Sequence, residues 1–152
     1  MIGGKLRLAD AAASEAFGAR LAGVVQPGDV IALSGQLGAG KTSIARGLLA
    51  ALGLEEEAPS PSFAIVQPYA PPEVRMPVLH VDLYRIDHPG EAGELGLDEA
   101  RYDSVLIVEW PERLPESHWA DALWLSLTIL PDGARGLTAQ VPAAWKARWH
   151  LT

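Results

Sequence analysis

The chain has 152 residues, of which 49% are hydrophobic and 20% charged, the balance of a soluble globular protein that buries a single core. A formal net charge of −7 and only three lysines argue against unaided binding of nucleic acid, which requires clustered positive side chains. Cysteine is absent, which excludes disulfides and thiolate metal sites, and no apolar run approaches the roughly 20 residues that span a bilayer. We therefore expect a cytoplasmic protein, monomeric on its own and not bound to a membrane, whose residues 1–152 form one domain.

Up to residue 53 the sequence predicts alternating strands and helices. Residues 5–8 indicate a short first strand, and Asp10 is a suitable N-cap for a helix that ends near residue 22. Residues 30–33 are continuously apolar, as in a strand covered on both faces. After a glycine-rich loop, one face of a further helix carries apolar residues before Gly53 ends it: Ile44, Leu48, Leu49 and Leu52.

From residue 63 onward, strands dominate the prediction. Residues 63–66 and 78–81 flank a proline-rich connection at 68–77, which predicts an antiparallel hairpin with a long turn. Residues 90–101 are polar, and we expect them to be partly helical. Residues 105–108 form a second continuously apolar run and therefore a second buried strand of the parallel type.

The last part of the chain predicts a closing antiparallel pair, residues 123–130 and 137–141, around a Pro-Asp-Gly turn. Trp145 and Trp149 lie four residues apart, so we expect the tail, residues 142–152, to form a short helix that packs both indoles on the body of the protein. The order of elements indicates an α/β domain of three layers, with a mixed sheet and antiparallel additions.

Residues 35–42 read GQLGAGKT and match the pattern G-x-x-x-x-G-K-[ST] in full, between a buried strand and an amphipathic helix. The glycines allow backbone N–H groups to surround phosphate oxygens, and the start of the helix presents its positive dipole end to the same anion. The alternative is a glycine-rich turn without a ligand. In the P-loop NTPase-like interpretation, Lys41 bridges the β and γ phosphates and the Thr42 hydroxyl ligates Mg²⁺. The predicted binding residues of this segment are Gly35, Gln36, Leu37, Gly38, Ala39, Gly40, Lys41, Thr42 and Ser43.

A P-loop also needs a carboxylate at the end of a strand to hold the metal, directly or through water. Asp82 and Glu109 each follow an apolar run. Glu109 ends the cleaner buried strand and is our first choice for the metal. Asp82 would join it through water or orient the attacking water as a general base. For each residue, the alternative is a solvated carboxylate at a strand end.

Three further features are ambiguous from sequence alone. Residues 60–63 (SPSF) follow the P-loop helix, where P-loop proteins often sense the γ-phosphate, but a plain turn fits equally well. His80 lies near an acidic residue, although a lone histidine is more often an ordinary hydrogen-bonding residue than a base or ligand. Trp110 would cover the site, contact a partner or pack in the core.

Absences help to choose the nucleotide and the reaction. The chain contains no asparagine, so the Asn-Lys-x-Asp element that reads guanine is missing, and ATP is the expected nucleotide. Little of the chain remains for an arginine-bearing lid over a second substrate. This weakens the hypothesis of a free-standing kinase of a small metabolite without removing it. A regulator that binds nucleotide and hydrolyses it only incidentally is a third hypothesis.

Four motifs occur in order along the chain: GQLGAGKT at residues 35–42, SPSF at 60–63, HVDLYR at 80–85 and VEWPE at 108–112. Their identity and spacing resemble the TsaE (YjeE) family, over roughly residues 8–140. The loop of that family commonly reads GDLGAGKT and its later motif SPTF, so this chain differs at Gln36 and Ser62.

The resemblance implies a P-loop α/β fold without an acceptor lid, a weak intrinsic ATPase activity, and a role beside TsaD and TsaB. Those partners transfer a threonylcarbamoyl group to the adenine 3′ of certain tRNA anticodons, so tRNA would be contacted only through the complex. By the same resemblance, Thr42 and Glu109 hold Mg²⁺, Lys41 and the loop amides hold phosphate, Asp82 lies beside the γ-phosphate, and Arg135 reaches the nucleotide.

Overall fold

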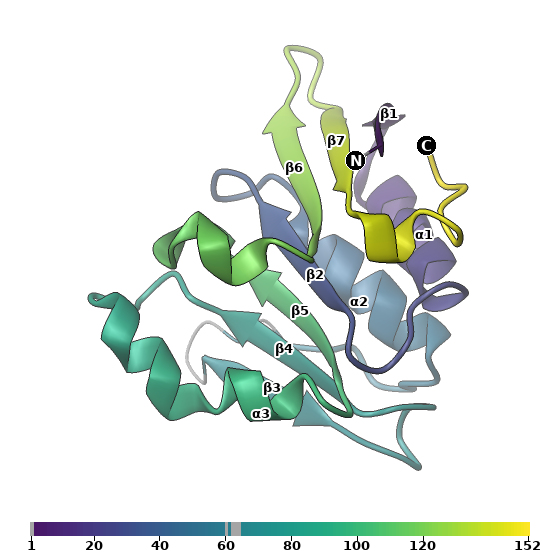
Figure 1. Cartoon of the computed structure of the whole chain (residues 1–152). Coiled ribbons are helices and arrows are strands. Elements are labelled where there is room, and N and C mark those ends of the chain that lie inside the picture. Colours follow the sequence, from purple (N-terminus) through teal and green to yellow (C-terminus); the bar gives the residue numbers. More distant parts are fainter. Residues whose placement is uncertain (1, 60, 62–64) are drawn as a thin grey trace.

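A seven-stranded mixed sheet of order β1-β7-β6-β2-β5-β4-β3 organises the computed structural model, which describes residues 2–59, 61 and 65–152 (Figure 1). The four inner strands β6, β2, β5 and β4 are parallel, and the pairs β1–β7, β7–β6 and β4–β3 are antiparallel. The strands are β1 (Ile2–Leu8), β2 (Val30–Ser34), β3 (Val66–Tyr69), β4 (Val78–Asp82), β5 (Val105–Glu109), β6 (Leu123–Ile129) and β7 (Arg135–Val141). The predicted mixed sheet with antiparallel additions is confirmed.

Helical elements cover both faces of this sheet and complete the predicted three layers (Figure 1). Helices α1 (Ala11–Ala22) and α2 (Lys41–Ala51) pack on one face. Shorter elements pack on the other face: η1 (Pro89–Leu95), α3 (Leu97–Ala100), η2 (Pro111–Arg113) and η3 (Glu116–Trp119), where η denotes a 3₁₀ helix. In the described ranges, no helix combines the length and apolar character needed to cross a membrane.

The side chains of the buried strand β2 point alternately to the two faces of the sheet and so contribute to the hydrophobic core on each face. Ile31 and Leu33 join the core under α1 and α2, whereas Val30 and Ala32 join the core on the opposite face. All of these side chains are at most 1% exposed. The continuous apolar run predicted for a doubly covered strand is therefore explained by burial on both faces.

The ends of the helices follow the capping residues that the sequence indicates. The Asp10 side chain accepts a hydrogen bond from the N–H of Ala13 at 2.8 Å and so caps α1. Helix α2 ends just before Gly53, whose N–H bonds to the carbonyl of Ala50.

The predicted hairpin exists, but its first strand lies further along the chain than expected. Strand β3 is Val66–Tyr69, so Pro68 belongs to the strand and pairs with Leu79 rather than lying in the connection. Because β3 is the edge strand of the sheet, the missing N–H of Pro68 is tolerated there. Residues 63 and 64 of the predicted strand lie outside the described residues.

The predicted terminal helix is much shorter than expected. Only η4 (Ala143–Trp145) is helical, and Trp149 lies beyond it. The two indoles still meet edge to face, 6.5 Å between centroids, and Trp145 is buried. An ion pair between Arg148 and Asp29, at 2.6 Å, fixes this part of the tail against a distant turn. Tertiary contacts rather than helical repetition therefore determine its path.

Helix α1 supports α2 at very close range. A Cβ atom added at Gly47 of α2 would lie 1.9 Å from the carbonyl oxygen of Glu15 on α1, which is shorter than any real contact of this kind. The absent side chain lets the two backbones touch, and α1 thereby sets the position of the helix that begins at Lys41.

We expect Gly47→Ala to destabilise the protein, although the same change in a free helix would favour helix formation. The added methyl must separate α1 from α2, at a cost of about 1–3 kcal/mol in the free energy of unfolding. The measurement is the midpoint of chemical unfolding. The control is Gly90→Ala, because nothing lies within 4 Å of a Cβ added at Gly90. A midpoint for Gly47→Ala at or above that of the unmodified protein would contradict the close packing.

Candidate functional site

The glycine-rich loop connects the end of β2 to the start of α2 at the carboxyl edge of the parallel strands. Gly40, the N-cap of α2, has φ of 104°, a left-handed conformation that a residue with a side chain rarely adopts. Residues 37–43 line a depression of about 270 Å³ together with Asp82, Glu109 and Trp110. The loop therefore has the predicted setting between a buried strand and a helix, and its interior faces an open cavity.

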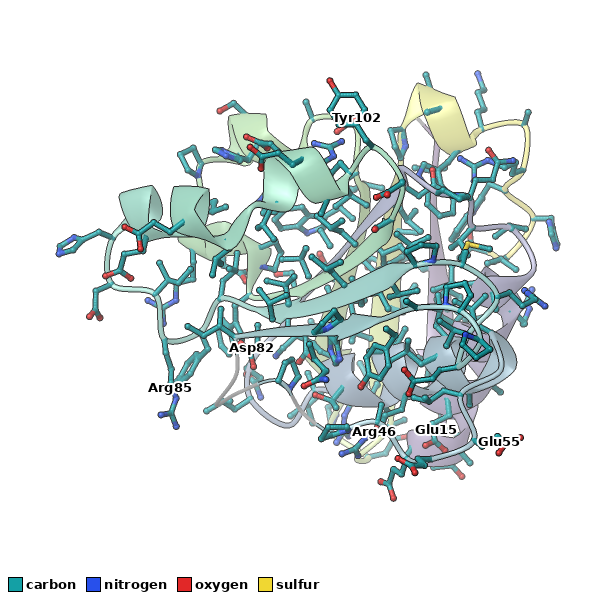
Figure 2. The ribbon with its side chains drawn as sticks, turned by 90° about the horizontal axis from the view of Figure 1, so that it is seen from below. Glu15, Arg46, Glu55, Asp82, Arg85 and Tyr102 are labelled. Atoms are coloured by element: carbon teal, nitrogen blue, oxygen red, sulfur yellow. The ribbon has the colours of Figure 1, made fainter. Side chains whose placement is uncertain are left out.

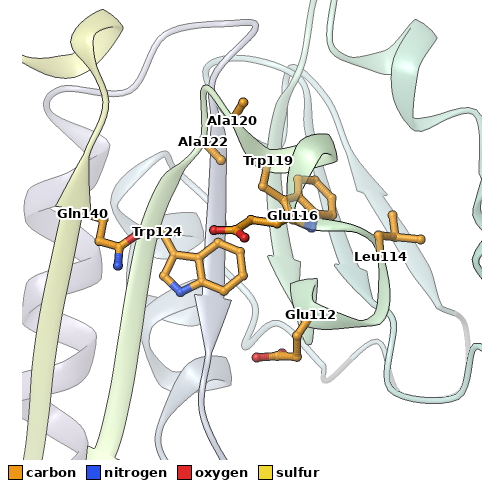
Figure 3. A pocket seen from close by; sticks show the side chains of 8 residues that line it. All are labelled: Glu112, Leu114, Glu116, Trp119, Ala120, Ala122, Trp124 and Gln140. Carbon is orange, nitrogen blue, oxygen red and sulfur yellow. The ribbon is translucent and has the colours of Figure 1, made fainter. Parts of the chain in front are cut away.

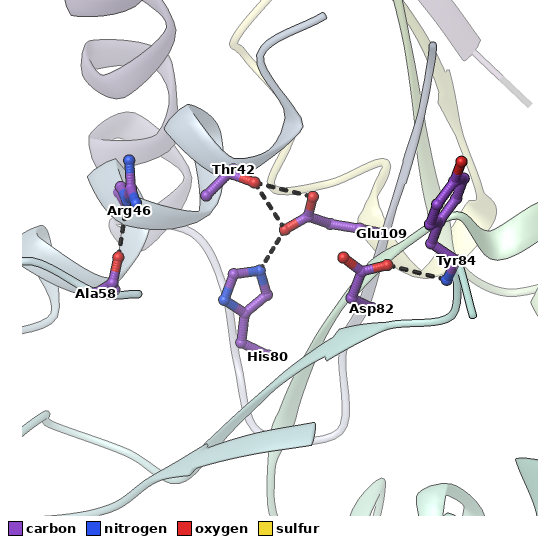
Figure 4. A network of polar contacts seen from close by, with 7 residues as sticks. All are labelled: Thr42, Arg46, Ala58, His80, Asp82, Tyr84 and Glu109. Atoms are coloured by element: carbon purple, nitrogen blue, oxygen red, sulfur yellow. Dashed lines mark hydrogen bonds and ion pairs between the residues drawn. The ribbon is translucent and has the colours of Figure 1, made fainter. Parts of the chain in front are cut away.

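Glu109 and Asp82 meet at this depression because their strands are neighbours. In the register of β4 with β5, Asp82 lies directly opposite Glu109, and both are buried, at 6% and 3% exposed. Thr42 Oγ1 donates to the carboxylate of Glu109, at 3.0 Å from Oε1 and 3.2 Å from Oε2 (Figure 4). The structure thus brings together Thr42, Glu109 and Asp82, which the sequence places up to 67 residues apart.

The donor set fits a magnesium ion. A hydroxyl and a carboxylate are the oxygen ligands that Mg²⁺ takes from a P-loop protein, with phosphate and water completing its octahedron. Within the described residues, no group of three or more histidines, cysteines or acids forms a metal cage.

Lys41 is buried at 5% exposure, and its ammonium group contacts the loop itself. Its Nζ donates to the carbonyl oxygens of Gly35 and Gln36 and lies 4.4 Å from the centroid of the Trp110 ring. Burial lowers the pKa of Lys41 below its ordinary value, and the nearby carboxylates of Glu109, Glu112 and Asp82 partly oppose this change. The cation is held in a poorly solvated position where a phosphate would be a strong partner.

Trp110 lines one side of the depression and also packs against the core on the face of the sheet opposite α1 and α2, so it combines two of the roles that the sequence leaves open. Its φ of 61° is uncommon for so large a residue and turns the chain from β5 into η2. The indole is half-buried, and its ring centroid lies 4.8 Å from that of Tyr84. Trp110 and Tyr84 thus form an aromatic wall beside Lys41.

Asp82 is fixed at the end of β4 by backbone contacts. Its Oδ1 accepts from the N–H of Tyr84 at 2.9 Å, and its own N–H bonds to the carbonyl of Ile65 (Figure 4). Arg85, three residues later, extends outward at the surface (Figure 2). Asp82 lines the depression. This position is compatible with its predicted role beside the γ-phosphate, which stays a prediction.

The described residues on either side of the SPSF segment, Ala58 and Ile65, are hydrogen-bonded to α2 and β4. Before it, Arg46 of α2 donates to the carbonyl of Ala58 at 2.7 Å, and after it, Ile65 accepts from Asp82. Ser60 and Ser62 lie outside the described residues, so phosphate sensing by this segment stays a prediction.

A second cavity, of about 420 Å³, lies between η2–η3 and strands β6 and β7, and none of the predicted site residues lines it (Figure 3). Trp119 and Trp124 contribute indoles to it, and Glu112 borders it. Glu112 also accepts a hydrogen bond from Ser34, the residue before the loop. No positively charged side chain of the described residues lines this cavity, whereas Lys41 lines the depression at residues 37–43, so the depression is the better candidate for binding phosphate.

Comparison with known proteins agrees with the motifs. The sequence profile of the family described as "Threonylcarbamoyl adenosine biosynthesis protein TsaE" matches residues 8–136. The chain belongs to the TsaE family. The match covers the P-loop, Asp82, Glu109 and Arg135, and it favours the interpretation from the motifs over that of a free-standing kinase.

Relatives and a solved structure support this membership. The chain is similar to the tRNA threonylcarbamoyladenosine biosynthesis protein TsaE of Streptomyces coelicolor, with 41% identity over 81% of either chain. It is 33% identical to the protein of the same name from Bacillus subtilis, over 88% of this chain and 83% of that one. The crystal structure of Bacillus subtilis YdiB superposes with a TM-score of 0.76 at 28% identity, covering 97% of this chain and 90% of the other.

Three contacts of this TsaE-family site were not predicted from sequence. His80 is hydrogen-bonded to Glu109, Glu112 to Ser34, and Arg135 to the loop carbonyl of Gly38, at 2.9 Å. Each joins elements that are distant in sequence. The signals for His80 were its place at the start of the HVDLYR motif and its position two residues before Asp82, which puts both side chains on one face of a strand.

Proposed function

We propose that this TsaE-family protein binds ATP with Mg²⁺ and acts, beside TsaD and TsaB, in the threonylcarbamoyladenosine modification of tRNA in the cytoplasm. The observation that carries the proposal is the meeting of Thr42 and Glu109 beneath a complete P-loop. The names of the relatives supply the biosynthetic setting. The net charge of −7 supports contact with tRNA through partners rather than directly.

In this proposal, different residues of the site bind the phosphates and the metal ion. The N–H groups of the loop and the ammonium of Lys41 bind the phosphates, with Lys41 leaving the carbonyls of Gly35 and Gln36 for the anion. Thr42 and Glu109 would hold Mg²⁺, which when bound would neutralise the negative charge of the phosphates. Ser43 lines the same depression, beside Thr42.

We further propose that the protein is a weak ATPase when alone. Asp82 faces the depression and would orient the attacking water beside the γ-phosphate. The depression is open rather than enclosed. Water that reaches the γ-phosphate without fixed orientation forfeits much of the positioning that accelerates phosphoryl transfer. A partner that covers this face would supply the missing order.

Arg135 is proposed to support the loop and to reach the nucleotide from the β6–β7 hairpin. Its Nη2 donates to the carbonyl of Gly38, and another of its nitrogens donates to Gly133. If the hydrogen bond to the carbonyl of Gly38 broke, the guanidinium of Arg135 would be free to turn toward the phosphates of a bound nucleotide.

We expect Lys41→Ala and Thr42→Ala each to weaken the binding of a slowly hydrolysed ATP analogue with Mg²⁺ by roughly 10- to 100-fold, because a charge-assisted contact is lost. Calorimetric titration measures the affinity, and circular dichroism confirms folding. Lys146→Ala, a change at an exposed lysine far from the loop, is the matched control. Unchanged affinity in both folded variants would refute the P-loop assignment.

We expect phosphate release by the isolated chain to be far slower than the rate of an ordinary enzyme, about 10 per second, and to rise when TsaD and TsaB are both present. The physical reason is the open site, which a partner surface would close. Phosphate release is measured for the chain alone, with TsaB, with TsaD and with both. The Lys41→Ala variant controls for contaminating activity. Equal rates in all four mixtures would contradict the role of the partners.

A further inference from the structure

His80 is a buried histidine with one close polar partner. Its side chain is 0% exposed, and its Nε2 lies 2.6 Å from Oε2 of Glu109 (Figure 4). Its other nitrogen, Nδ1, has no hydrogen-bond partner among the residues that the structure describes. Strands β4 and β5 hold this arrangement, since His80 lies opposite Ile107, two residues before Glu109.

The direction of the bond follows from the chemistry of the pair. A carboxylate only accepts hydrogen bonds, so Nε2 of His80 is the donor and Oε2 of Glu109 the acceptor. Nδ1 is left as a buried polar atom, and such an atom costs about 1–3 kcal/mol of stability when it lacks a partner. An apolar side chain would fill this place without that cost, so the contribution of His80 lies in its bond to Glu109.

The bond restricts a side chain that its strand does not fix by itself. Glutamate has three rotatable bonds, so its position at the end of β5 leaves the direction of its carboxylate open. In the structure the carboxylate lies between two donors, His80 and Thr42 (Figure 4). His80 engages Oε2, and the Thr42 hydroxyl lies nearer to Oε1.

We propose that His80 is a positioning residue for the metal-binding carboxylate. By donating from Nε2 it holds Glu109 toward Thr42, so that a carboxylate oxygen and the hydroxyl already converge when the nucleotide arrives with its cation. Outer hydrogen bonds of this kind fix metal-ligating groups, and the loss of one typically weakens metal affinity by 10- to 100-fold, as an order of magnitude. The inference rests on the proposed Mg²⁺ site and adds the residue that orients it.

Calorimetry measures the dissociation constant of a slowly hydrolysed ATP analogue twice, once in the presence of Mg²⁺ and once in the presence of EDTA. The ratio of the two dissociation constants gives the contribution of Mg²⁺ to the affinity. His80→Leu should reduce the contribution of Mg²⁺ by about 10-fold. The affinity in EDTA should stay unchanged, because it depends on Lys41 and the loop amides, whereas the hydrogen bond of His80 goes to Glu109. His80→Gln should restore most of the ratio, because the amide nitrogen of glutamine reaches the place of Nε2. His80→Asn, whose amide is too short to reach Glu109, should not.

Two further comparisons make the outcome decisive. In a Glu109→Gln background, His80→Leu should cause no further loss of the Mg²⁺ contribution, since the two residues act through one bond. The unfolding midpoint of each variant is measured alongside, so that a loss of stability alone is separated from a loss of metal affinity. Equal ratios in the Gln and Asn variants, or an unchanged ratio in folded His80→Leu, would overturn the inference. If the affinity of the unmodified protein for the ATP analogue were the same with Mg²⁺ and with EDTA, the proposed metal site itself would be overturned.

Discussion

The hydrogen bond from Thr42 to Glu109 joins the P-loop helix to the parallel sheet, and the chemistry of the site depends on that junction. Thr42 is the second residue of α2, and Glu109 is the last residue of β5. A phosphate bound by the loop without Glu109 would lack a carboxylate that holds a metal ion beside it, and a carboxylate at the sheet edge without the loop would lack the phosphate. Because the two meet within 3.0 Å, a single metal ion can contact both and the nucleotide.

The rest of the fold keeps this junction in place. Helix α1 presses on α2 at Gly47, where only a glycine fits, and so sets the start of α2. Strands β4 and β5 run side by side in the parallel core, which places Asp82, Glu109 and His80 on one face. On the other side of the loop, Arg135 reaches across from the β6–β7 hairpin to Gly38. The loop and the carboxylates are thus supported by separate parts of one sheet.

Local patterns were enough to predict the P-loop, the buried strands β2 and β5, and the two carboxylates that follow apolar runs. What the sequence could not provide were contacts that depend on register or on distant segments. The bond of His80 to Glu109 spans 29 residues and exists only in the observed pairing of β4 with β5. The tail follows the ion pair of Arg148 with Asp29, 119 residues away, and not its helical spacing. Strand β3 was placed too early because Pro68 suggested a turn, whereas an edge strand accommodates it.

The most direct test is a crystal structure of the protein with a slowly hydrolysed ATP analogue and Mn²⁺ in place of Mg²⁺, with anomalous diffraction to locate the metal. We predict one anomalous peak about 2–2.5 Å from the Thr42 hydroxyl, beside the Glu109 carboxylate, with the nucleotide phosphates enclosed by residues 37–43. A metal bound without Thr42 and Glu109, or a nucleotide bound outside the loop, would contradict it.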